Sequence, residues 1–211
     1  MLAGDRRERP RLLALTIGGS PDAWRALGFT VDADGLFAAG DTVVRLDPDG
    51  PRGIRDWALT AAVTGLPTGP APARTAVPAA HPNHVTGIDH VVVTTSDLSG
   101  TTDALVAAGC EVRGERTASI GGRDVVQRFL PLQNALVELV AGAEGGAAPN
   151  DVRVSFWGIT FVCTDLAVAA VALGPGVGSP RPAVQPGRQI AVAGAEAGLG
   201  THVAFMSPRA G

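Results

Sequence analysis

The residue of this sequence with the clearest capacity for chemistry is His90. It stands in the stretch G-I-D-H-V-V-V-T-T-S-D-L, residues 87–98, where isoleucine, valine and threonine predominate. β-Branched residues in such a run predict a strand, and a strand that is apolar on both faces is usually buried on both faces. We therefore expect the imidazole of His90 to face a lined cavity or the core, and not the open surface.

Two further histidines, His81 and His84, stand in the short stretch H-P-N-H. Histidines three residues apart can share a metal ion, but Pro82 prevents a regular helix from presenting them on one face. A turn with two solvated histidines is the simpler interpretation.

Composition excludes several classes of protein. All 17 basic residues are arginines, which excludes chemistry through a lysine Schiff base and a phosphate-binding loop with its lysine. The net charge of −3 provides no basic surface for nucleic acid, and no apolar run approaches the ~18 residues of a membrane-spanning helix. The two cysteines, Cys110 and Cys163, are too few for a disulfide framework. We expect buried, unreactive thiols in a soluble, cytoplasmic protein.

An internal repeat places His90 in a larger unit. Residues 155–166, S-F-W-G-I-T-F-V-C-T-D-L, align with the stretch around His90 so that Asp165 matches Asp97, an offset of 68 residues (165 − 97). Each stretch reads as a strand, an aspartate suited to cap a helix, an apolar helix and a glycine. Three strand-like runs follow each helix, so the order strand, helix and three strands occurs twice.

The first third of the chain repeats this order loosely. It reads as a strand, a helix that starts at Ser20-Pro21-Asp22, and a run of short strands separated by turn sequences. With 211 residues, 45% of them hydrophobic, the chain can form one domain or one and a half. We divide it into a βαβββ-like half module, a Pro/Ala-rich linker and a domain of two modules, at residues 1–62, 63–86 and 87–211, with the modules at 87–142 and 155–208.

A family resemblance follows from these residues. The motif G-I-D-H-V-V-V-T-T-S-D-L and the strand A-L-V-E-L-V at residues 135–140 resemble the vicinal oxygen chelate superfamily, well over residues 87–208 and weakly over residues 12–60. This group includes glyoxalase I, bleomycin-resistance proteins, fosfomycin-resistance enzymes and extradiol dioxygenases. The resemblance implies an α+β fold in which paired βαβββ modules form a cupped mixed sheet, with helices on the outer face and a small-molecule ligand in the cup.

The resemblance also implies a metal site. Metal-using members take their ligands from the first and last strands of each module, which implies His90 and Glu138 as metal ligands and catalytic residues. An imidazole and a carboxylate suit Zn²⁺, Fe²⁺, Ni²⁺ or Mn²⁺, and a catalytic metal needs a third ligand and an open position as well. Gln127 or His202 can supply that third ligand if the strand register turns the side chain inward.

The second module departs from this pattern. Gly158, which lies 68 residues after His90, has no side chain. The position that matches Glu138 is Ala204 or Phe205, depending on one residue of register. None of these can bind a metal, so half of the usual ligand set is absent.

Other side chains are predicted to contact the ligand or the core. Trp157, next to Gly158, is expected on the helix-packed side of the sheet because strand residues alternate between faces. Arg128 and Arg188 can anchor an anionic ligand, although an arginine on a strand is more often a solvated residue. The residues predicted to bind substrate are Gln127, Arg128, Arg188 and Phe205.

The pattern leaves two functional classes open. His90 and Glu138 can bind a metal in an isomerase, lyase or dioxygenase, or Glu138 can act as a general base. Alternatively they form a metal-free polar pair, either structural or in contact with a ligand, in a protein that binds or sequesters a small molecule. A scaffold without a ligand is a third interpretation.

The first third also bears on assembly. A lone module leaves an apolar sheet face and free strand edges, which proteins normally cover. Residues 12–60 can pack on the outside of their own domain or pair with a second copy of the chain. We predict the second arrangement, a homodimer in which residues 12–60 contribute much of the interface, because twofold pairing is the commonest assembly of soluble proteins.

Overall fold

The computed structural model describes residues 8–73, 80–143 and 153–209, and places them in two stacked sheets. The smaller sheet has the strand order β2-β3-β1-β4. Its elements are β1 (Leu12–Gly18), α1 (Pro21–Ala26), β2 (Leu36–Ala39), β3 (Thr42–Asp47) and β4 (Gly53–Leu59).

The larger sheet contains two modules with the same internal strand order. Its full order is β10-β11-β12-β9-β5-β8-β7-β6, so the first strand of each module lies beside the last strand of that module. The elements of the first module are β5 (Val85–Thr95), α2 (Leu98–Ala107), β6 (Gly114–Ile120), β7 (Arg123–Pro131) and β8 (Leu136–Gly142). Those of the second are β9 (Val154–Cys163), α3 (Leu166–Leu173), η1 (Gly174–Gly176), β10 (Arg181–Pro182), β11 (Gln189–Val192), η2 (Ala195–Ala197) and β12 (His202–Met206).

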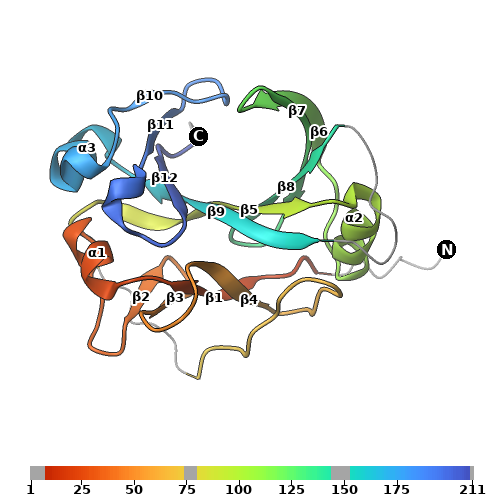
Figure 1. Ribbon diagram of the computed structural model, residues 1–211, viewed down its shortest axis with the longest axis horizontal. Coiled ribbons are helices and arrows are strands. Elements are labelled where there is room, and N and C mark those ends of the chain that lie inside the picture. The colour runs from red at the N-terminus through yellow and green to blue at the C-terminus, as the bar shows by residue number, and fades with distance from the viewer. Residues whose placement is uncertain (1–7, 74–79, 144–152, 210–211) are drawn as a thin grey trace.

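The large sheet curls into a cup. Figure 1 shows β5 and β9 at its base, β6–β8 rising on one side and β10–β12 on the other, with α2 and α3 outside. The predicted α+β fold of paired βαβββ modules is therefore confirmed. The offset of 68 residues is visible in the helix caps, where Asp97 accepts a hydrogen bond from Gly100 N–H and Asp165 accepts one from Val168 N–H.

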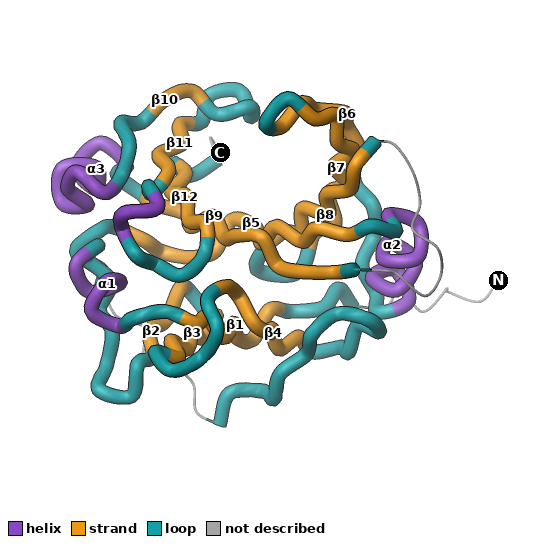
Figure 2. The backbone as a smooth tube through the Cα atoms, viewed as in Figure 1, coloured by secondary structure: helices purple, strands orange, loops and turns teal. Residues whose placement is uncertain are grey.

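The small sheet covers the convex face of the cup. Figure 2 shows β1–β4 as a layer beneath β5 and β9. Trp24, Phe29 and Phe37 from the small sheet and its connections pack against Phe161 of β9. The two sheets therefore share one hydrophobic core. The prediction that residues 12–60 pair with a second copy is wrong, because the chain takes the other arrangement and covers this apolar face itself.

The edge of β1 is covered as well. β1 lies between β3, which is parallel to it, and β4, which is antiparallel. In the large sheet β5 likewise lies between parallel β8 and antiparallel β9. In the small sheet β4 thus occupies the place that the first strand of a partner module occupies in the large one. Homodimer formation stays a prediction, but without this interface.

The end of the linker docks onto the small sheet through His81. This side chain is buried; its Nδ1 accepts a hydrogen bond from Thr30 N–H at 2.9 Å and its Nε2 donates one to the Ala38 carbonyl at 2.7 Å. Both ring nitrogens are therefore committed to the backbone. The interpretation of H-P-N-H as a turn with two solvated histidines is wrong for His81, whereas His84 is exposed and adopts a left-handed backbone with φ of 56°.

The two thiols behave as the sequence predicts. Cys110 and Cys163 are both buried and unpaired. Burial raises the pKa of the Cys110 thiol to about 11, and burial is also the main cause that raises the pKa of Cys163. Thiols with raised pKa values are poor nucleophiles at neutral pH. Among the described residues, no helix is long and apolar enough to cross a membrane.

Asn134, in the turn between β7 and β8, joins the two sheets. Its Oδ1 accepts a hydrogen bond from Leu12 N–H at 2.9 Å, and its Nδ2 donates to the Leu12 carbonyl at 2.9 Å and to Thr42 Oγ1 at 3.1 Å. One side chain therefore satisfies both backbone groups at the start of β1.

We expect Asn134→Ala to lower the free energy of unfolding by about 2 kcal/mol, because it removes the partner of the Leu12 N–H and leaves the Leu12 carbonyl with the Thr42 hydroxyl alone, at 3.0 Å. Chemical denaturation measures this change. The neighbouring Gln133→Ala is the matched control, since Gln133 is exposed and donates only to the Arg9 carbonyl through its side chain. Equal losses in both variants would show that Asn134 does not join the sheets.

Candidate functional site

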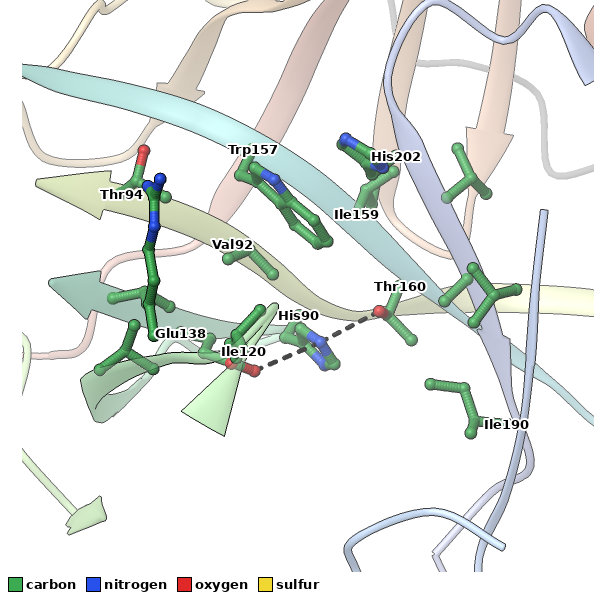
Figure 3. Close-up of a pocket in the computed structure, with 16 residues that line it drawn as sticks. His90, Val92, Thr94, Ile120, Glu138, Trp157, Ile159, Thr160, Ile190 and His202 are labelled. Carbon is green, nitrogen blue, oxygen red and sulfur yellow. Dashed lines mark hydrogen bonds and ion pairs between the residues drawn. The ribbon is translucent and has the colours of Figure 1, made fainter. Parts of the chain in front are cut away.

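The concave side of the cup holds a cavity of about 380 Å³. Three polar side chains lie together on its floor, namely His90 of β5, Glu138 of β8 and Thr160 of β9 (Figure 3). The walls and rim are mainly apolar, with Arg123 adding a charged side chain; the apolar residues are Val92, Ile120, Val125, Val140, Trp157, Ile159, Ile190, Val192, Val203 and Ala204.

His90 is held from both ring nitrogens. Nδ1 lies 2.8 Å from Asp89 Oδ2, and Nε2 lies 3.0 Å from Thr160 Oγ1 and 3.5 Å from Glu138 Oε2. Both His90 and Glu138 line the cavity, as the sequence predicts. In the neutral imidazole, donation from Nδ1 to Asp89 leaves Nε2 as the acceptor that faces the cavity.

A β-bulge explains how two consecutive residues can contact each other. In the antiparallel pairing of β5 with β9, Ile88 lies opposite Phe161 and His90 lies opposite Thr160. Asp89 is therefore an extra residue with no partner in β9. A bulge of this kind bends the strand and re-aims its side chains, so the carboxylate of Asp89 reaches the imidazole of His90.

β9 carries a second bulge, which corrects the prediction for Trp157. Val92 lies opposite Gly158 and Val93 opposite Phe156, so Trp157 is the extra residue. Simple alternation would have placed Trp157 in the core. The side chain is 48% exposed and lines the mouth of the cup instead.

The two bulges lie at equivalent positions of the two modules, since Trp157 follows Asp89 by the same 68 residues (157 − 89). The bulge in β5 brings a carboxylate against the imidazole of His90 from behind the floor, and the bulge in β9 brings an indole to the mouth. There Trp157 stacks on His202 with ring centroids 4.2 Å apart and an interplanar angle of 11°.

Glu138 is held by the neighbouring strands. Gln127 of β7 is buried; its Nε2 donates to Glu138 Oε1, and its Oε1 accepts from Arg116 Nε at 2.6 Å. Arg116 in turn lies over the ring of Phe129, 5.4 Å from its centroid. The carboxylate of Glu138 is thereby fixed with its second oxygen toward His90.

Asp89 is held as a carboxylate. Burial alone would raise its pKa, but hydrogen bonds from His90 and Arg188, together with the charges of those two groups, lower the pKa to about 2. Arg188 Nη2 lies 2.6 Å from Asp89 Oδ1, and both side chains are almost fully buried. A permanent negative charge beneath His90 favours protonation at Nδ1 and fixes the direction of Nε2.

None of the four residues predicted to bind substrate lines the cup, and three of them point away from it. On β7 the side chain of Gln127 points inward, so Arg128 points outward, where it pairs with Glu115 at 2.6 Å and with Thr102 of α2 at 3.0 Å. On β12 the inward residue is Ala204, and Phe205 is fully buried in the core between the sheets. The placement of Arg128 and Phe205 at the ligand is therefore corrected by strand alternation. Arg188, also predicted, lies behind the floor.

The metal-ligating side chains of the cup do not make up a complete metal site. His90 Nε2 and Glu138 Oε2, 3.5 Å apart, are suited to two positions around one ion. The amide oxygen of Gln127 is already bonded to Arg116, and His202 is stacked at the mouth on Trp157. Among the described residues, no group of three or more His, Cys, Asp or Glu is arranged to hold a metal. The residues present do not fit a complete site of the kind that the resemblance implies.

The second module could not supply the missing ligand without rearrangement. A Cβ atom on Gly158 would lie 2.7 Å from the His202 carbonyl oxygen and 2.9 Å from the Cβ of His202. Glycine is therefore required where β9 and β12 approach most closely, and any side chain there must move β12.

Comparison with known proteins gives structural likeness alone. No family model and no curated protein matches the sequence. The solved structures that the chain resembles include methylmalonyl-CoA epimerase from Mycobacterium tuberculosis, with 17% identity and a TM-score of 0.46, covering 60% of this chain and 91% of that one. Another is Streptomyces coelicolor methylmalonyl-CoA epimerase in complex with 2-nitronate-propionyl-CoA, with 20% identity and a TM-score of 0.46, covering 60% and 99%. A hypothetical protein from Bacillus halodurans has 15% identity and a TM-score of 0.45, covering 59% and 95%.

The strand order of the large sheet agrees with the architecture that the sequence resemblance implies, because each module places its first strand beside its last and the two first strands pair at the centre. The fold is a cupped sheet of paired βαβββ modules. The likeness concerns about three fifths of the chain, and the small sheet lies outside the part that the superfamily resemblance covers well.

Several residues of the site were not identified from the sequence. Asp89 stands next to His90, but alternation assigns the two to opposite faces, and no residue in the stretch signals a bulge. Thr160 was within reach of inference, since pairing the first strands of the two modules places it opposite His90. Nothing in the sequence pointed to Arg116, because its hydrogen bond to Gln127 depends on the direction in which the Gln127 side chain points.

We expect Asp89→Asn to reduce both stability and its pH dependence. A folded pKa of about 2, against an ordinary value of 3.8, means that the unfolded chain binds more protons near pH 3. The stabilisation is therefore fully present above pH ~5 and is lost as the pH falls toward 2; it amounts to roughly 2 kcal/mol. Urea denaturation between pH 7 and pH 2.5 measures it. Asp124→Asn, at an exposed carboxylate, is the control, and parallel pH profiles for wild type and Asp89→Asn would contradict the prediction.

We expect Gly158→Ala to lower the free energy of unfolding by about 1–3 kcal/mol, because the added methyl group overlaps the backbone of β12. Thermal or chemical denaturation measures the loss. Gly142→Ala, at the end of β8 where nothing lies within 4 Å of the added atom, is the control. A Gly158→Ala variant as stable as the control would show that this position tolerates a side chain.

Proposed function

We propose that this chain binds a small, mainly apolar molecule in the cup and directs one polar group of that molecule to the floor formed by His90, Glu138 and Thr160. The observation that carries the proposal is the cavity of about 380 Å³ whose walls are mainly apolar and on whose floor His90, Glu138 and Thr160 converge. Such a distribution is typical of small-molecule sites, in which apolar walls provide affinity and a few polar groups fix the orientation.

The mouth of the cup favours a flat ligand. The stacked rings of Trp157 and His202 stand beside the exposed side chains of Ile120 and Val192. Exposed apolar side chains gathered around a cavity mark a binding surface, and an aromatic ligand gains both apolar contact and ring stacking there. A molecule with an aromatic ring and one hydroxyl or carbonyl group matches the mouth and the floor together.

The binding is proposed to be independent of a metal ion. His90 and Glu138 supply two of the ligands that a metal ion needs. The amide oxygen of Gln127 is already bonded to Arg116, and Gly158 has no side chain to add. In the absence of a metal, the floor offers the Glu138 carboxylate as an acceptor, whereas His90 Nε2 and the Thr160 hydroxyl are bonded to each other. A ligand hydroxyl can therefore donate to Glu138.

A second candidate is proton transfer at a bound substrate. The 3.5 Å separation of His90 Nε2 and Glu138 Oε2 in one cavity favours it, because two titratable groups in reach of one substrate can act as acid and base. In this reading Asp89 and Gln127 are positioning residues: Asp89 holds the imidazole and Gln127 holds the carboxylate.

We expect 1-naphthol to bind and to quench the fluorescence of Trp157, since Trp24 and Trp57 are fully buried and do not line the cup. Glu138→Gln should weaken 1-naphthol about tenfold and leave naphthalene unchanged, because only the former offers a hydroxyl to the carboxylate. Val92→Phe, which fills the cavity, should abolish both. Calorimetry with Trp157→Phe controls for the optical signal. Unchanged affinity in Val92→Phe would overturn binding in the cup.

Metal analysis of protein purified without a histidine tag separates the two functional classes. We expect no stoichiometric divalent metal, and no change in metal content on Glu138→Gln. A stoichiometric ion that is lost in this variant would overturn the metal-free proposal and favour the metal-dependent enzyme that the superfamily resemblance implies.

A further inference from the structure

A second cavity, of about 340 Å³, lies behind the floor of the cup. It is formed by the start of β5, the turn between β7 and β8, the end of β9 and the segments that flank β11 and β12. It shares no lining residue with the cup among the described residues. The lining residues that matter here are Ile88, Asp89, Leu132, Val162, Arg188 and Arg209.

Arg188 has one guanidinium nitrogen without a partner. Its Nε donates to the Ser207 carbonyl at 2.7 Å and its Nη2 to Asp89 Oδ1 at 2.6 Å, whereas Nη1 has no hydrogen-bond acceptor within the described part of the chain. The residue is only 4% exposed. A buried donor of a charged group that lacks an acceptor destabilises the protein, so an oxygen supplied by a ligand would be bound favourably at this nitrogen.

The charges around this cavity specify the sign of the charge on the ligand. Arg188 and Arg209 contribute two positive charges, and Asp89 contributes one negative charge that already bonds to Arg188. One positive charge is left without compensation among the described lining residues. Asn134 also borders the cavity, but its amide is committed to Leu12 and Thr42.

The remaining walls specify the body of the ligand. Ile88, Leu132 and Val162 are joined there by alanine, leucine and proline side chains, which offer no hydrogen bonds. A monoanion with an apolar body therefore fits better than a phosphate or a dianion, which would bring more charge than the single uncompensated cation can balance.

We propose that this second cavity binds a small organic monocarboxylate, with the carboxylate between Arg188 Nη1 and the guanidinium of Arg209 and the apolar body against Ile88, Leu132 and Val162. Nη1 is enclosed, so the carboxylate reaches it by a small displacement of the wall, for which the exposed Arg209 side chain is the movable part. The site is separate from the proposed function of the cup and does not depend on it.

Hexanoate titrated into the full chain at pH 7, followed by calorimetry, tests the proposal, with 1-hexanol and hexylammonium as uncharged and cationic probes of the same length. We expect hexanoate alone to bind. Arg209→Gln, at an exposed side chain, should weaken it at least threefold. Arg188→Lys keeps a cation beside Asp89 but removes Nη1, and should weaken it at least tenfold.

Val92→Phe distinguishes the two cavities. Hexanoate affinity should be unchanged in this variant, which fills the cup, while 1-naphthol affinity is lost. The proposal is overturned if Val92→Phe abolishes hexanoate binding, if 1-hexanol binds as tightly as hexanoate, or if Arg209→Gln and Arg188→Lys both leave the affinity unchanged. Circular dichroism checks that each variant is folded. If Arg188→Lys does not fold, the affinity of Arg209→Gln for hexanoate decides the test.

Discussion

Antiparallel pairing between β5 and β9 is the constraint on which the rest of the structure depends. These strands join the two modules edge to edge and form the base of the cup. Their register places Thr160 opposite His90 and brings Glu138, from the strand on the other side of β5, to the same floor. A shift of one residue would send these side chains to the opposite face of the sheet, where the apolar core lies.

The two modules share a backbone plan but divide the chemistry unequally. The first contributes His90 and Glu138, and at the equivalent positions the second contributes Gly158 and Ala204. The close approach of the His202 carbonyl to Gly158 gives this inequality a steric cause. The first module therefore carries the titratable groups of the floor, to which the second adds the Thr160 hydroxyl.

The sequence predicts those parts of the fold that rest on repeated local signals. The offset between Asp97 and Asp165, both of which cap helices, predicted two modules and the order of their elements along the chain. The pairing of His90 with Glu138 followed from the resemblance. The bulges at Asp89 and Trp157 could not be predicted from the sequence. An extra residue in a strand depends on the register with the neighbouring strand and does not change the amino-acid composition in a recognisable way. The packing of residues 12–60 was not predicted for a related reason. Whether β4 covers the edge of β1 depends on the tertiary fold.

The stacking of the small sheet on the cup has a consequence for how the chain acquires its structure. Trp24 donates a hydrogen bond to the Leu199 carbonyl at 3.2 Å, across 175 residues of sequence, and packs against Phe161. During synthesis β1–β4 therefore leave the ribosome before the surface that covers them has been translated. Until β9 and β12 have been synthesised, these strands of the chain cannot cover the apolar face of β1–β4. That exposed face is where chaperones would bind and where two chains would associate.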